Sequence, residues 1–510
     1  LRSIDRFVDL SSVRAHLAPF YSAIGRPSID PELMLRMLIV GYTHGIRSER
    51  RLCEEVRLNL AYRWFCRLDL TDPIPDHSTF SKNRHGRFRD SDLFRKVFED
   101  VVARCITEGL VGGERFAADA SLIHADANKL NSTAKEDWDL DAIDPETAPR
   151  AVVEYLSALD DAAFGAATDV TPKFTSHSDP SSQWTAAHHG PAYFAYSNNY
   201  LIDTDHAIIV DVQASRSVRT GETHATRTMI ERVRKRFELW PERLIADMAY
   251  GSGEMLGWLV EERGIEPHIP VIDKSKRADG TFSREDFAYD HKTDAYICPA
   301  GKELRRNRRK FQSIRNEPKD AGFAKYGAIK ADCDACHLKE RCCPKGAPRR
   351  IMRSEHEGAR QMARDIAATD EYALSCKLRK KIEMRWHRAM CVMLGVSYEV
   401  RGEMAQPDGH GVLIAANHVS WIDILVMGSI APISFVAKEE VRDWPIFGAF
   451  ARWQESVFVD RAARRTVHEQ AERINARLLA GENIVLFPEG TTSDGNFIYP
   501  FKSSLFAYRV

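Results

Sequence analysis

The chain has 510 residues, with 72 Lys and Arg against 73 Asp and Glu and a formal net charge of -1. Its length predicts several domains, about three, instead of one core. The balanced charge neither demands nor excludes a polyanionic partner. Whether such a partner is expected has to be judged from local patches of charge. Ten cysteines in so long a chain, with no apolar leader at the N-terminus, exclude a small secreted disulfide scaffold.

A membrane-spanning helix is not expected either. No window holds the roughly 18 uninterrupted apolar residues that such a helix requires. The segment 412–437 comes closest, but Asn417, His418 and Asp423 interrupt it. We therefore expect a cytoplasmic protein without a signal peptide or a transmembrane helix. The chain begins with Leu1 instead of methionine, and we expect an incomplete N-terminus.

Apolar residues recur at helical spacing in residues 31–67 and predict an N-terminal helical domain over 1–112. Within it, Pro75–Arg84 provides a polar helix start. Lys82 and Arg84 give this helix a basic side that can lie on DNA phosphates. A solvated basic helix face is the alternative, because charged faces are common on surface helices.

Two aspartates follow or interrupt segments with the character of buried strands. Residues 115–124 form a short apolar segment with Asp119 in its middle, and residues 244–246 form a second one that leads into Asp247. A buried carboxylate is costly unless it is paired or bound to a cation. An aspartate satisfied by a neighbouring amide is the alternative for either site.

A third acid, Glu383, lies four residues after Arg379 and shares one helical face with it. Three carboxylates from separate parts of a sheet-and-helix domain have a physical reason to converge, because they can hold two Mg2+ ions roughly 3.5 to 4 Å apart. Mn2+ can replace Mg2+. One ion would activate a water or a DNA 3′-hydroxyl, and the other would stabilise the leaving 3′-oxygen.

A cysteine-rich insertion is predicted at about 271–350. Its cysteine spacing fits a tetrahedral Zn2+ site. The predicted ligands are Cys298, Cys333, Cys336 and Cys342, with His337 or Cys343 as substitutes. Free structural cysteines are the alternative, since the segment has one Cys-x2-Cys pair. Arg305 and Arg306 belong to a basic strip at 302–310, which we expect to contact nucleic acid.

Residues 1 to about 384 resemble DDE-type insertion-sequence transposases with an RNase H-like catalytic domain. The motifs that carry the resemblance are Gly25–Ser28, Pro75–Phe80, the Asp119 strand, Ala246–Ser252, Tyr296–Lys302, Cys333–Cys342 and Arg379–Glu383. The resemblance implies that Asp119, Asp247 and Glu383 bind the metal ions. It implies that Tyr250 and Arg379 orient DNA or the third acid. Its partners would be double-stranded DNA and a second copy on that DNA, at the nucleoid.

After Glu383 the sequence departs from that family, because no lysine follows in register. Three buried strands are predicted at 412–416, 433–437 and 483–487. His418 and Asp423 follow the first of these and can act as a base and its orienting acid. The carboxylate would fix the tautomer of the imidazole, so that the free nitrogen takes a proton from a hydroxyl group.

This segment resembles the 1-acylglycerol-3-phosphate acyltransferase family. The motifs are the His-x4-Asp pair, Phe458–Arg461 and Phe487–Ser493. By resemblance, the acceptor phosphate would lie against Arg461, Glu489 and Gly490. Thr492 stands where many members have arginine. The donor would be acyl-CoA or acyl-ACP, and the segment would touch a membrane peripherally.

The sequence therefore predicts a multidomain α/β chain: a helical domain over 1–112, an RNase H-like mixed α/β domain over 113–384 and a truncated α/β acyltransferase domain over 385–510. We interpret it as a transposase fused to an acyltransferase fragment that is incomplete at both ends and has little or no turnover. One alternative is an acyltransferase or bifunctional protein that uses His418 and Asp423. Another is a non-catalytic DNA-binding remnant.

Overall fold

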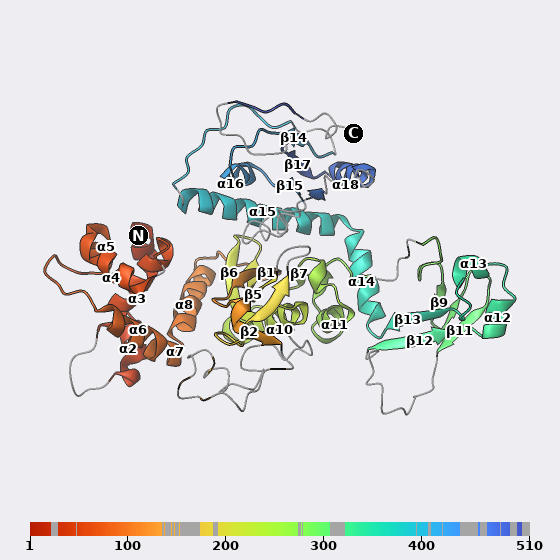
Figure 1. Ribbon diagram of the computed structural model, residues 1–510, viewed down its shortest axis with the longest axis horizontal. Coiled ribbons are helices and arrows are strands. Elements are labelled where there is room, and N and C mark those ends of the chain that lie inside the picture. The colour runs from red at the N-terminus through yellow and green to blue at the C-terminus, as the bar shows by residue number, and fades with distance from the viewer. Residues whose placement is uncertain are drawn as a thin grey trace. The chain divides into compact units, whose positions relative to one another are not determined.

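The computed structural model describes residues 1–21, 29–46, 48–134, 137, 144, 147, 152, 174–186, 192–273, 277, 279–306, 322–393, 395–405, 410–420, 422–438, 457–459, 467–479, 481–489 and 497–501. The chain separates into two compact units, Leu1–Val111 and Gly112–Val510. Figure 1 labels their elements in chain order. The motif Gly25–Ser28 lies outside the described residues.

The N-terminal unit is helical throughout its described part. Its helices are α1 (Arg2–Phe7), α2 (Val13–Leu17), α3 (Pro31–Thr43), α4 (Glu49–Leu58), α5 (Leu60–Phe65), α6 (His77–His85), α7 (Arg87–Asp90) and α8 (Leu93–Thr107). The Asp30 carboxylate caps α3 by accepting a hydrogen bond of 2.9 Å from the Glu32 amide. The apolar faces meet in one core around Met34, Phe65 and Phe80. The predicted helical domain is therefore present.

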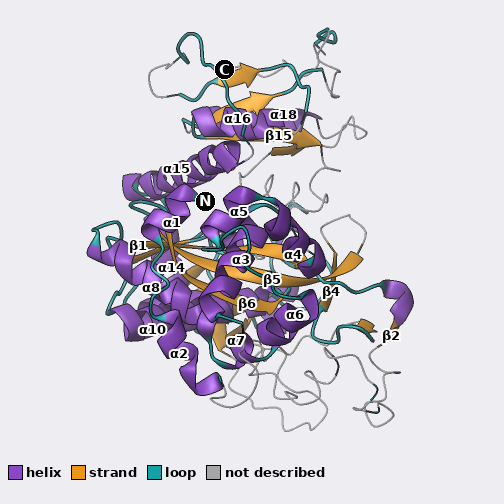
Figure 2. Ribbon diagram, turned by 90° about the vertical axis from the view of Figure 1, so that its left-hand side faces the viewer, coloured by secondary structure: helices purple, strands orange, loops and turns teal. Residues whose placement is uncertain are grey.

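A six-stranded sheet lies at the centre of the second unit (Figure 2). Its strands are β1 (Arg115–His124), β4 (Gln183–Ala186), β5 (Ala192–Asp203), β6 (Ile208–Arg216), β7 (Arg243–Ile245) and β8 (Glu266–His268). The order is β4-β5-β1-β7-β8, with β6 paired to β5. Strand β1 is antiparallel to β5 and parallel to β7, which makes the sheet mixed.

Helices pack on this sheet and position its ends. They are α10 (Arg219–Phe237), α11 (Gly253–Gly257), α14 (Glu357–Ala367) and α15 (Asp370–Met393), with short helical turns at Met248–Tyr250 and Trp258–Glu262. Helix α10 lies against β5 and β6. Helix α15 inserts Ile382 into a cluster with Ala117, Ile202 and Ile245. The apolar side of the sheet thus has helical cover on which functional groups can be placed.

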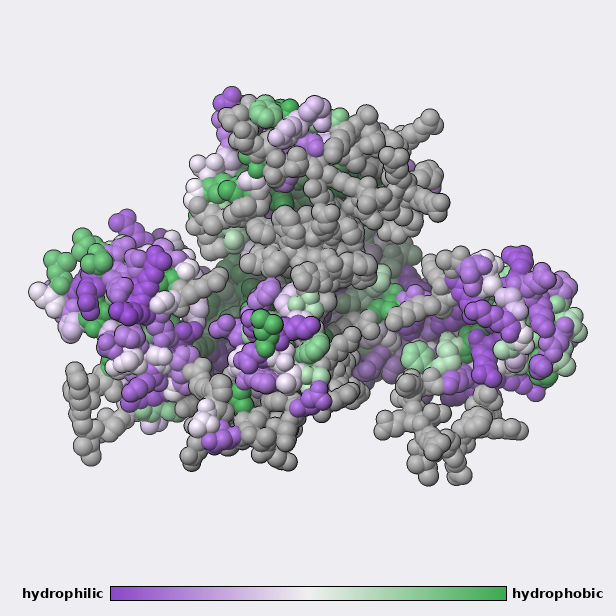
Figure 3. Space-filling view, in the orientation of Figure 1, coloured by the Kyte–Doolittle hydropathy of each residue, from purple (hydrophilic) through white to green (hydrophobic). Residues whose placement is uncertain are grey.

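The cysteine-rich insertion is a small antiparallel sheet. Its strands are β9 (Ala288–Asp290), β10 (Ala295–Ile297), β11 (Glu303–Arg306), β12 (Phe323–Gly327) and β13 (Arg350–Ser354), with α12 (Lys330–Asp334) and α13 (Lys339–Cys342) beside them. A core of Phe287, Tyr296, Leu304, Tyr326 and Ile351 holds it together. On the face drawn in Figure 3 its residues are mostly hydrophilic. Two further short strands, β2 (Ser132–Ala134) and β3 (Phe174–Ser176), pair elsewhere in the unit.

The C-terminal part contains a parallel sheet. Its strands are β14 (Leu413–Ala415), β15 (Ile433–Lys438), β16 (Val457–Val459) and β17 (Asn483–Leu486), in the order β14-β17-β15-β16. Helices α16 (Ile422–Ile430) and α18 (Val467–Leu479) accompany them. The three strands predicted from the sequence are thereby confirmed. Among the described helices, none has the length and apolar character needed to cross a bilayer.

Helix α15 continues without a break past Glu383, as Figure 1 shows. Its second half packs on α16. The Arg388 Nε donates a 2.7 Å hydrogen bond to the Ser429 carbonyl. The buried His387 ring lies against Gly428, where an added Cβ would come within 2.6 Å of His387 Nδ1. Only glycine fits here without displacing the ring, so Gly428 sets how closely the two helices approach.

We predict that Gly428→Ala lowers the stability of the C-terminal part by about 1 to 3 kcal/mol, because the new methyl group overpacks the α15–α16 contact. Thermal unfolding of the purified chain measures the change. Gly358→Ala is the matched control, since Gly358 is an exposed helical glycine with nothing within 4 Å of an added Cβ. This control should raise stability by about 0.5 to 1 kcal/mol. Equal effects of the two substitutions would contradict the packing argument.

Candidate functional sites

Asp119 lies in the middle of β1, and its side chain is partly buried. Burial raises the pKa of Asp119 to about 7. The Arg379 guanidinium acts in the opposite direction, and the Asp247 carboxylate adds to the increase in pKa. These three groups are therefore close enough for their charges to act on one another, although they come from separate stretches of the chain.

The sheet register explains why Asp119 and Asp247 meet. Strands β1 and β7 are parallel, and Ala117 pairs with Ile245 at the end of their ladder. Each aspartate follows its paired residue by two positions, so the two lie side by side just past the end of the ladder between β1 and β7. Asp247 also accepts a 2.8 Å hydrogen bond from the Ala249 amide, which starts the helical turn that follows.

Helix α15 brings Glu383 and Arg379 to the sheet. Glu383 is buried, and its Oε1 lies 3.9 Å from the Nε of Arg379. Arg379 thus lies beside Glu383 and within electrostatic reach of Asp119. The predicted pairing of residues 379 and 383 on one helical face is present. A single guanidinium is shared by two of the three predicted metal-binding acids.

Glu222 on α10 is a further acid of this cluster, and the sequence analysis missed it. Its carboxylate contributes to the raised pKa of Asp119 and accepts a 2.9 Å hydrogen bond from the Ser197 hydroxyl. The signal was available in the helical pattern. Residue 222 precedes the buried Ala225, Met229 and Val233 on the inward side of α10.

Tyr250 is fully buried beside the same acids. Burial raises its pKa well above the ordinary value, and the charges of Glu222, Asp119 and Asp247 act in the same direction. The hydroxyl therefore stays protonated at neutral pH and can donate a hydrogen bond.

No group of three or more His, Cys, Asp or Glu side chains in the described part of the chain is placed to hold a metal ion. The chemistry of the donors nevertheless suits a divalent cation at the acids. Asp119 and the exposed Asp247 are close enough for their charges to repel each other, and a cation would relieve that repulsion. Whether Glu383 joins them around such an ion stays a prediction.

Some of the cysteines of the insertion lie close to one another. Burial raises the pKa of the Cys333 thiol, and the nearby Cys343 and Cys298 thiols add to the effect. Cys343, named from the sequence as a substitute ligand, thus lies beside Cys333. The Lys302 amide donates a 3.3 Å hydrogen bond to Cys298 Sγ. Zn2+ binding by Cys298, Cys333, Cys336 and Cys342 stays a prediction.

The basic residues predicted to contact DNA differ in their surroundings. Lys82 is exposed on α6. Arg84 pairs with Glu49 at 3.0 Å and donates a 2.8 Å hydrogen bond to the Tyr42 hydroxyl, so part of its role is to hold helices together. Arg305 and Arg306 are exposed on β11, near Glu303 at 3.1 Å and Asp294 at 3.8 Å respectively. The other residues of the basic strip, 307–310, lie outside the described residues.

A second constellation lies at the start of α16. His418 Nδ1 is 2.9 Å from Asp423 Oδ2. The same carboxylate oxygen accepts hydrogen bonds from the amides of Val419 and Ser420, which fixes its position. The His418 ring stacks on Phe487, with ring centroids 4.2 Å apart. With Nδ1 bound to Asp423, Nε2 is the ring nitrogen that remains for a hydroxyl proton.

Glu489 connects the two predicted motifs of this segment. It is buried, and its Oε1 accepts a 3.2 Å hydrogen bond from the His418 amide. Its Oε2 accepts a 3.2 Å hydrogen bond from the Tyr499 amide. Glu489 therefore holds the loop that carries His418, a positioning role that the sequence did not indicate. Arg461, Gly490 and Thr492 lie outside the described residues.

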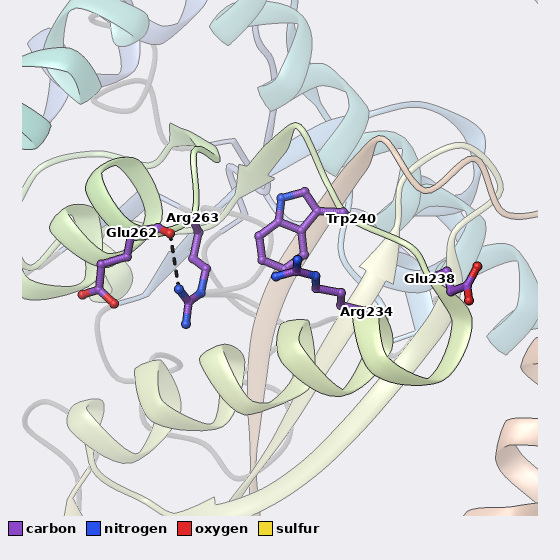
Figure 4. Close-up of a pocket in the computed structure, with 5 residues that line it drawn as sticks. All are labelled: Arg234, Glu238, Trp240, Glu262 and Arg263. Carbon is purple, nitrogen blue, oxygen red and sulfur yellow. Dashed lines mark hydrogen bonds between the residues drawn. The ribbon is translucent and has the colours of Figure 1, made fainter.

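A separate hollow of about 600 Å3 lies where α10 ends (Figure 4). The Arg234 guanidinium lies over the Trp240 ring, 4.6 Å from its centroid. Arg263 lines the same hollow and pairs with Glu231 at 2.5 Å. The two arginines are matched by Glu238 and Glu262 in the lining. This hollow contains none of the candidate acids and has no excess charge.

Three family models match the chain. Residues 1–86 match a transposase domain (DUF772), residues 165–389 match a transposase DDE domain, and residues 397–509 match an acyltransferase domain. Asp247 and Glu383 fall within the second match, and His418, Asp423 and Glu489 fall within the third.

The acyltransferase part is also similar to curated proteins. The lyso-ornithine lipid O-acyltransferase of Rhizobium meliloti is 50% identical over 133 residues, which is 26% of this chain and 45% of that protein. The 1-acyl-sn-glycerol-3-phosphate acyltransferase of Neisseria meningitidis is 38% identical over 128 residues, 25% of this chain and 50% of that protein. The chain spans about half the length of the curated relatives it matches.

A solved acyltransferase from Thermotoga maritima is 27% identical, covers 27% of this chain and 56% of its own, and has a TM-score of 0.23. The DDE match ends at residue 389, within α15, and the acyltransferase match begins at residue 397, shortly after that helix ends. The chain carries transposase domains, the second of them of the DDE type, followed by an acyltransferase domain.

Proposed function

We propose that this chain is a DNA transposase that cleaves phosphodiester bonds and transfers the strands of an insertion element. The observation that supports the proposal best is the shared electrostatic environment of Asp119, Asp247 and Arg379 within a chain that matches a DDE domain. Glu383 lies beside Arg379 and completes the predicted set of acids. Double-stranded DNA is the proposed substrate, bound by two copies of the chain in the cytoplasm.

The acids would hold Mg2+ or Mn2+, which supplies activation of the attacking oxygen and stabilisation of the leaving one when bound. The chain's own residues prepare the site. Asp119 has to lose its proton near neutral pH before it can act as a ligand. Arg379 balances the negative charge of the acids and can hold a DNA phosphate. Tyr250 keeps a neutral hydroxyl, and because the side chain is buried this hydroxyl can orient the neighbouring acids but not the DNA itself.

In the insertion, we propose a structural role for Zn2+ bound by the thiols around Cys333. Four thiolates would leave no open coordination position, so this module would stabilise the subdomain without taking part in the reaction. Metal analysis of the purified protein checks it.

Acyl transfer is a second candidate function, favoured by the contact between His418 and Asp423. Asp423 would keep the proton of the imidazole on Nδ1. Nε2 would then remove the proton of an acceptor hydroxyl as the hydroxyl oxygen attacks the thioester of acyl-CoA or acyl-ACP. The acceptor would be lysophosphatidate or a lyso-ornithine lipid, the classes named by the relatives. Arg461 and Gly490 would contribute to acceptor binding.

We predict that Asp119→Asn, Asp247→Asn and Glu383→Gln each reduce Mg2+-dependent cleavage of DNA by at least about 100-fold, because each removes a ligand charge worth several kcal/mol in the transition state. The assay uses a plasmid that carries the gene in its native flanks. DNA binding should persist in all three. Asp205→Asn is the control, since Asp205 pairs with Arg115 at 2.7 Å outside the acid cluster. Full cleavage by the Asp119→Asn variant would refute the proposed site.

We predict that Asp119→Asn stabilises the metal-free protein at pH 8. Asp119 has a folded-state pKa of about 7, above its ordinary value of 3.8, so the folded state binds the proton more tightly. Stability is therefore lost as pH rises from about 4 to 7, by a few kcal/mol at most. Asparagine removes this loss of stability. The free energies of unfolding of the two proteins should therefore converge as pH falls towards 4.

Urea unfolding between pH 4 and 8 in EDTA measures this difference. The control is Asp211→Asn, which should destabilise the protein because Asp211 is a buried aspartate paired with Arg232 at 2.8 Å. If Asp119→Asn lowers the free energy of unfolding at pH 8, the charge of Asp119 does not destabilise the folded chain.

We predict that any acyl transfer by the 510-residue chain depends on His418. His418→Ala should lower the rate by about 100- to 10,000-fold, as expected for loss of a general base. Asp423→Asn should also lower it, while leaving cleavage of DNA unchanged. The assay offers acyl-CoA or acyl-ACP with lysophosphatidate or lyso-ornithine lipid and measures the diacylated product. Turnover that survives His418→Ala would exclude the proposed base.

A further inference from the structure

An arginine-rich cavity of about 460 Å3 lies beside the loop that follows Asp247. The lining comes from this loop, from Phe323 on β12, from Arg349 and β13, from the start of α14, and from Ile272, Asp273, Arg277 and Arg284. Five arginines line the cavity against two acids, Asp273 and Glu357. The lining thus carries a formal charge of +3, in contrast to the balanced hollow at the end of α10.

The two acids are already engaged by other arginines. Glu357 lies 2.8 Å from Arg284 and 3.2 Å from Arg360. Asp273 lies 3.6 Å from Arg284 and 3.3 Å from Arg364, which is adjacent to the cavity. These contacts form an ion network that joins α14 to the insertion. The charge in excess is therefore that of the remaining lining arginines.

The remaining arginines are Arg277, Arg349 and Arg350. Arg349 is buried and donates hydrogen bonds to the carbonyl oxygens of Phe282, at 2.6 Å, and Cys342, at 3.3 Å. Its Nε is buried and has no hydrogen-bond partner in the described part of the chain. Holding these cations together in a recess is unfavourable unless an anion joins them.

The cavity is attached rigidly to the loop of the candidate acids. An added Cβ at Gly251 would lie 1.9 Å from the Pro270 carbonyl oxygen, so only glycine permits this approach. The Ile272 amide donates a 2.9 Å hydrogen bond to the Gly251 carbonyl. Ser252 and Gly253 line the cavity and follow Asp247 by five and six residues. These contacts therefore hold the cavity close to the loop that follows Asp247.

We propose that this cavity binds a phosphodiester group of DNA, a few nucleotides along the strand from the phosphate that reacts at the acids. Arg277 and Arg350 are exposed and can reach a phosphate with paired N–H groups. Phe323 and Met352 supply a partly exposed apolar wall that suits the sugar. The inference rests on the proposed transposase function and adds a second anchor for the same strand.

The test measures binding of the full chain to a DNA duplex in EDTA, which prevents metal-dependent cleavage, at several salt concentrations. Arg277→Gln and Arg350→Gln should each reduce the slope of log affinity against log salt by about one, as loss of one phosphate contact does. Arg277→Lys should restore the slope because it restores the charge. Lys292→Gln is the matched control, since Lys292 is exposed on the turn between β9 and β10 and does not line the cavity.

Slopes in Arg277→Gln and Arg350→Gln that equal that of the unaltered chain would overturn the phosphate site. If the chain cleaves DNA while these slopes are unchanged, the site fails and the transposase function stands. If the slopes fall but no cleavage occurs in Mg2+, the site stands and the catalytic proposal fails. Inorganic phosphate is the competing probe. Millimolar phosphate should reduce the difference between Arg277→Gln and the unaltered chain, since both ligands would compete for the same cations. Phosphate binding that is lost in Arg277→Gln while the DNA slopes stay equal would assign the cavity to free phosphate and overturn the DNA assignment.

Discussion

Helix α15 is the constraint on which both candidate sites depend, because one straight helix packs on two different partners. Its Ile382 and Glu383 lie towards the RNase H-like sheet, where Ile382 joins the apolar cluster of β1, β5 and β7. Lys380 and His387 lie on another side, against Glu482 and Gly428. At 100° per residue these two stripes are separated by roughly a third of a turn. Neither packing surface can shift without moving the third acid.

This double use explains how a join between unrelated domains can leave an ordered structure. The DDE match ends within α15 and the acyltransferase match begins just after it, and the segment Asp370–Met393 contains no glycine or proline. Such a segment favours a continuous helix whatever its origin. At Glu482, burial acts to raise the pKa, but Arg477 and Lys380 outweigh it and hold the pKa below its ordinary value. A lysine contributed by the helix of the third acid thus stabilises a charge in the acyltransferase part.

Strand-level features could be predicted from sequence because their pattern is local. The apolar segment 115–124 forms β1, and the apolar runs at 413–415 and 483–486 form β14 and β17. The contact between His418 and Asp423 follows from a spacing of five residues at a helix start. The hydrogen bonds that Glu489 accepts from the His418 and Tyr499 amides could not be foreseen. They depend on which distant elements pack together, and no local periodicity encodes that.

The acid cluster shows why a site of this kind strains the fold that carries it. Asp119 is placed by the register of β1 and β7, and the same register brings Asp247 beside it. Because the ladder of β1 and β7 sets where both backbones lie, the two carboxylates are close enough for their charges to interact. Arg379 offsets part of the repulsion, but it comes from α15 and also lies beside Glu383. The charge balance of the site is therefore set by the helix that the acyltransferase part holds in place. Coupling between the two domains would act through that helix, by altering how far Arg379 neutralises the acids.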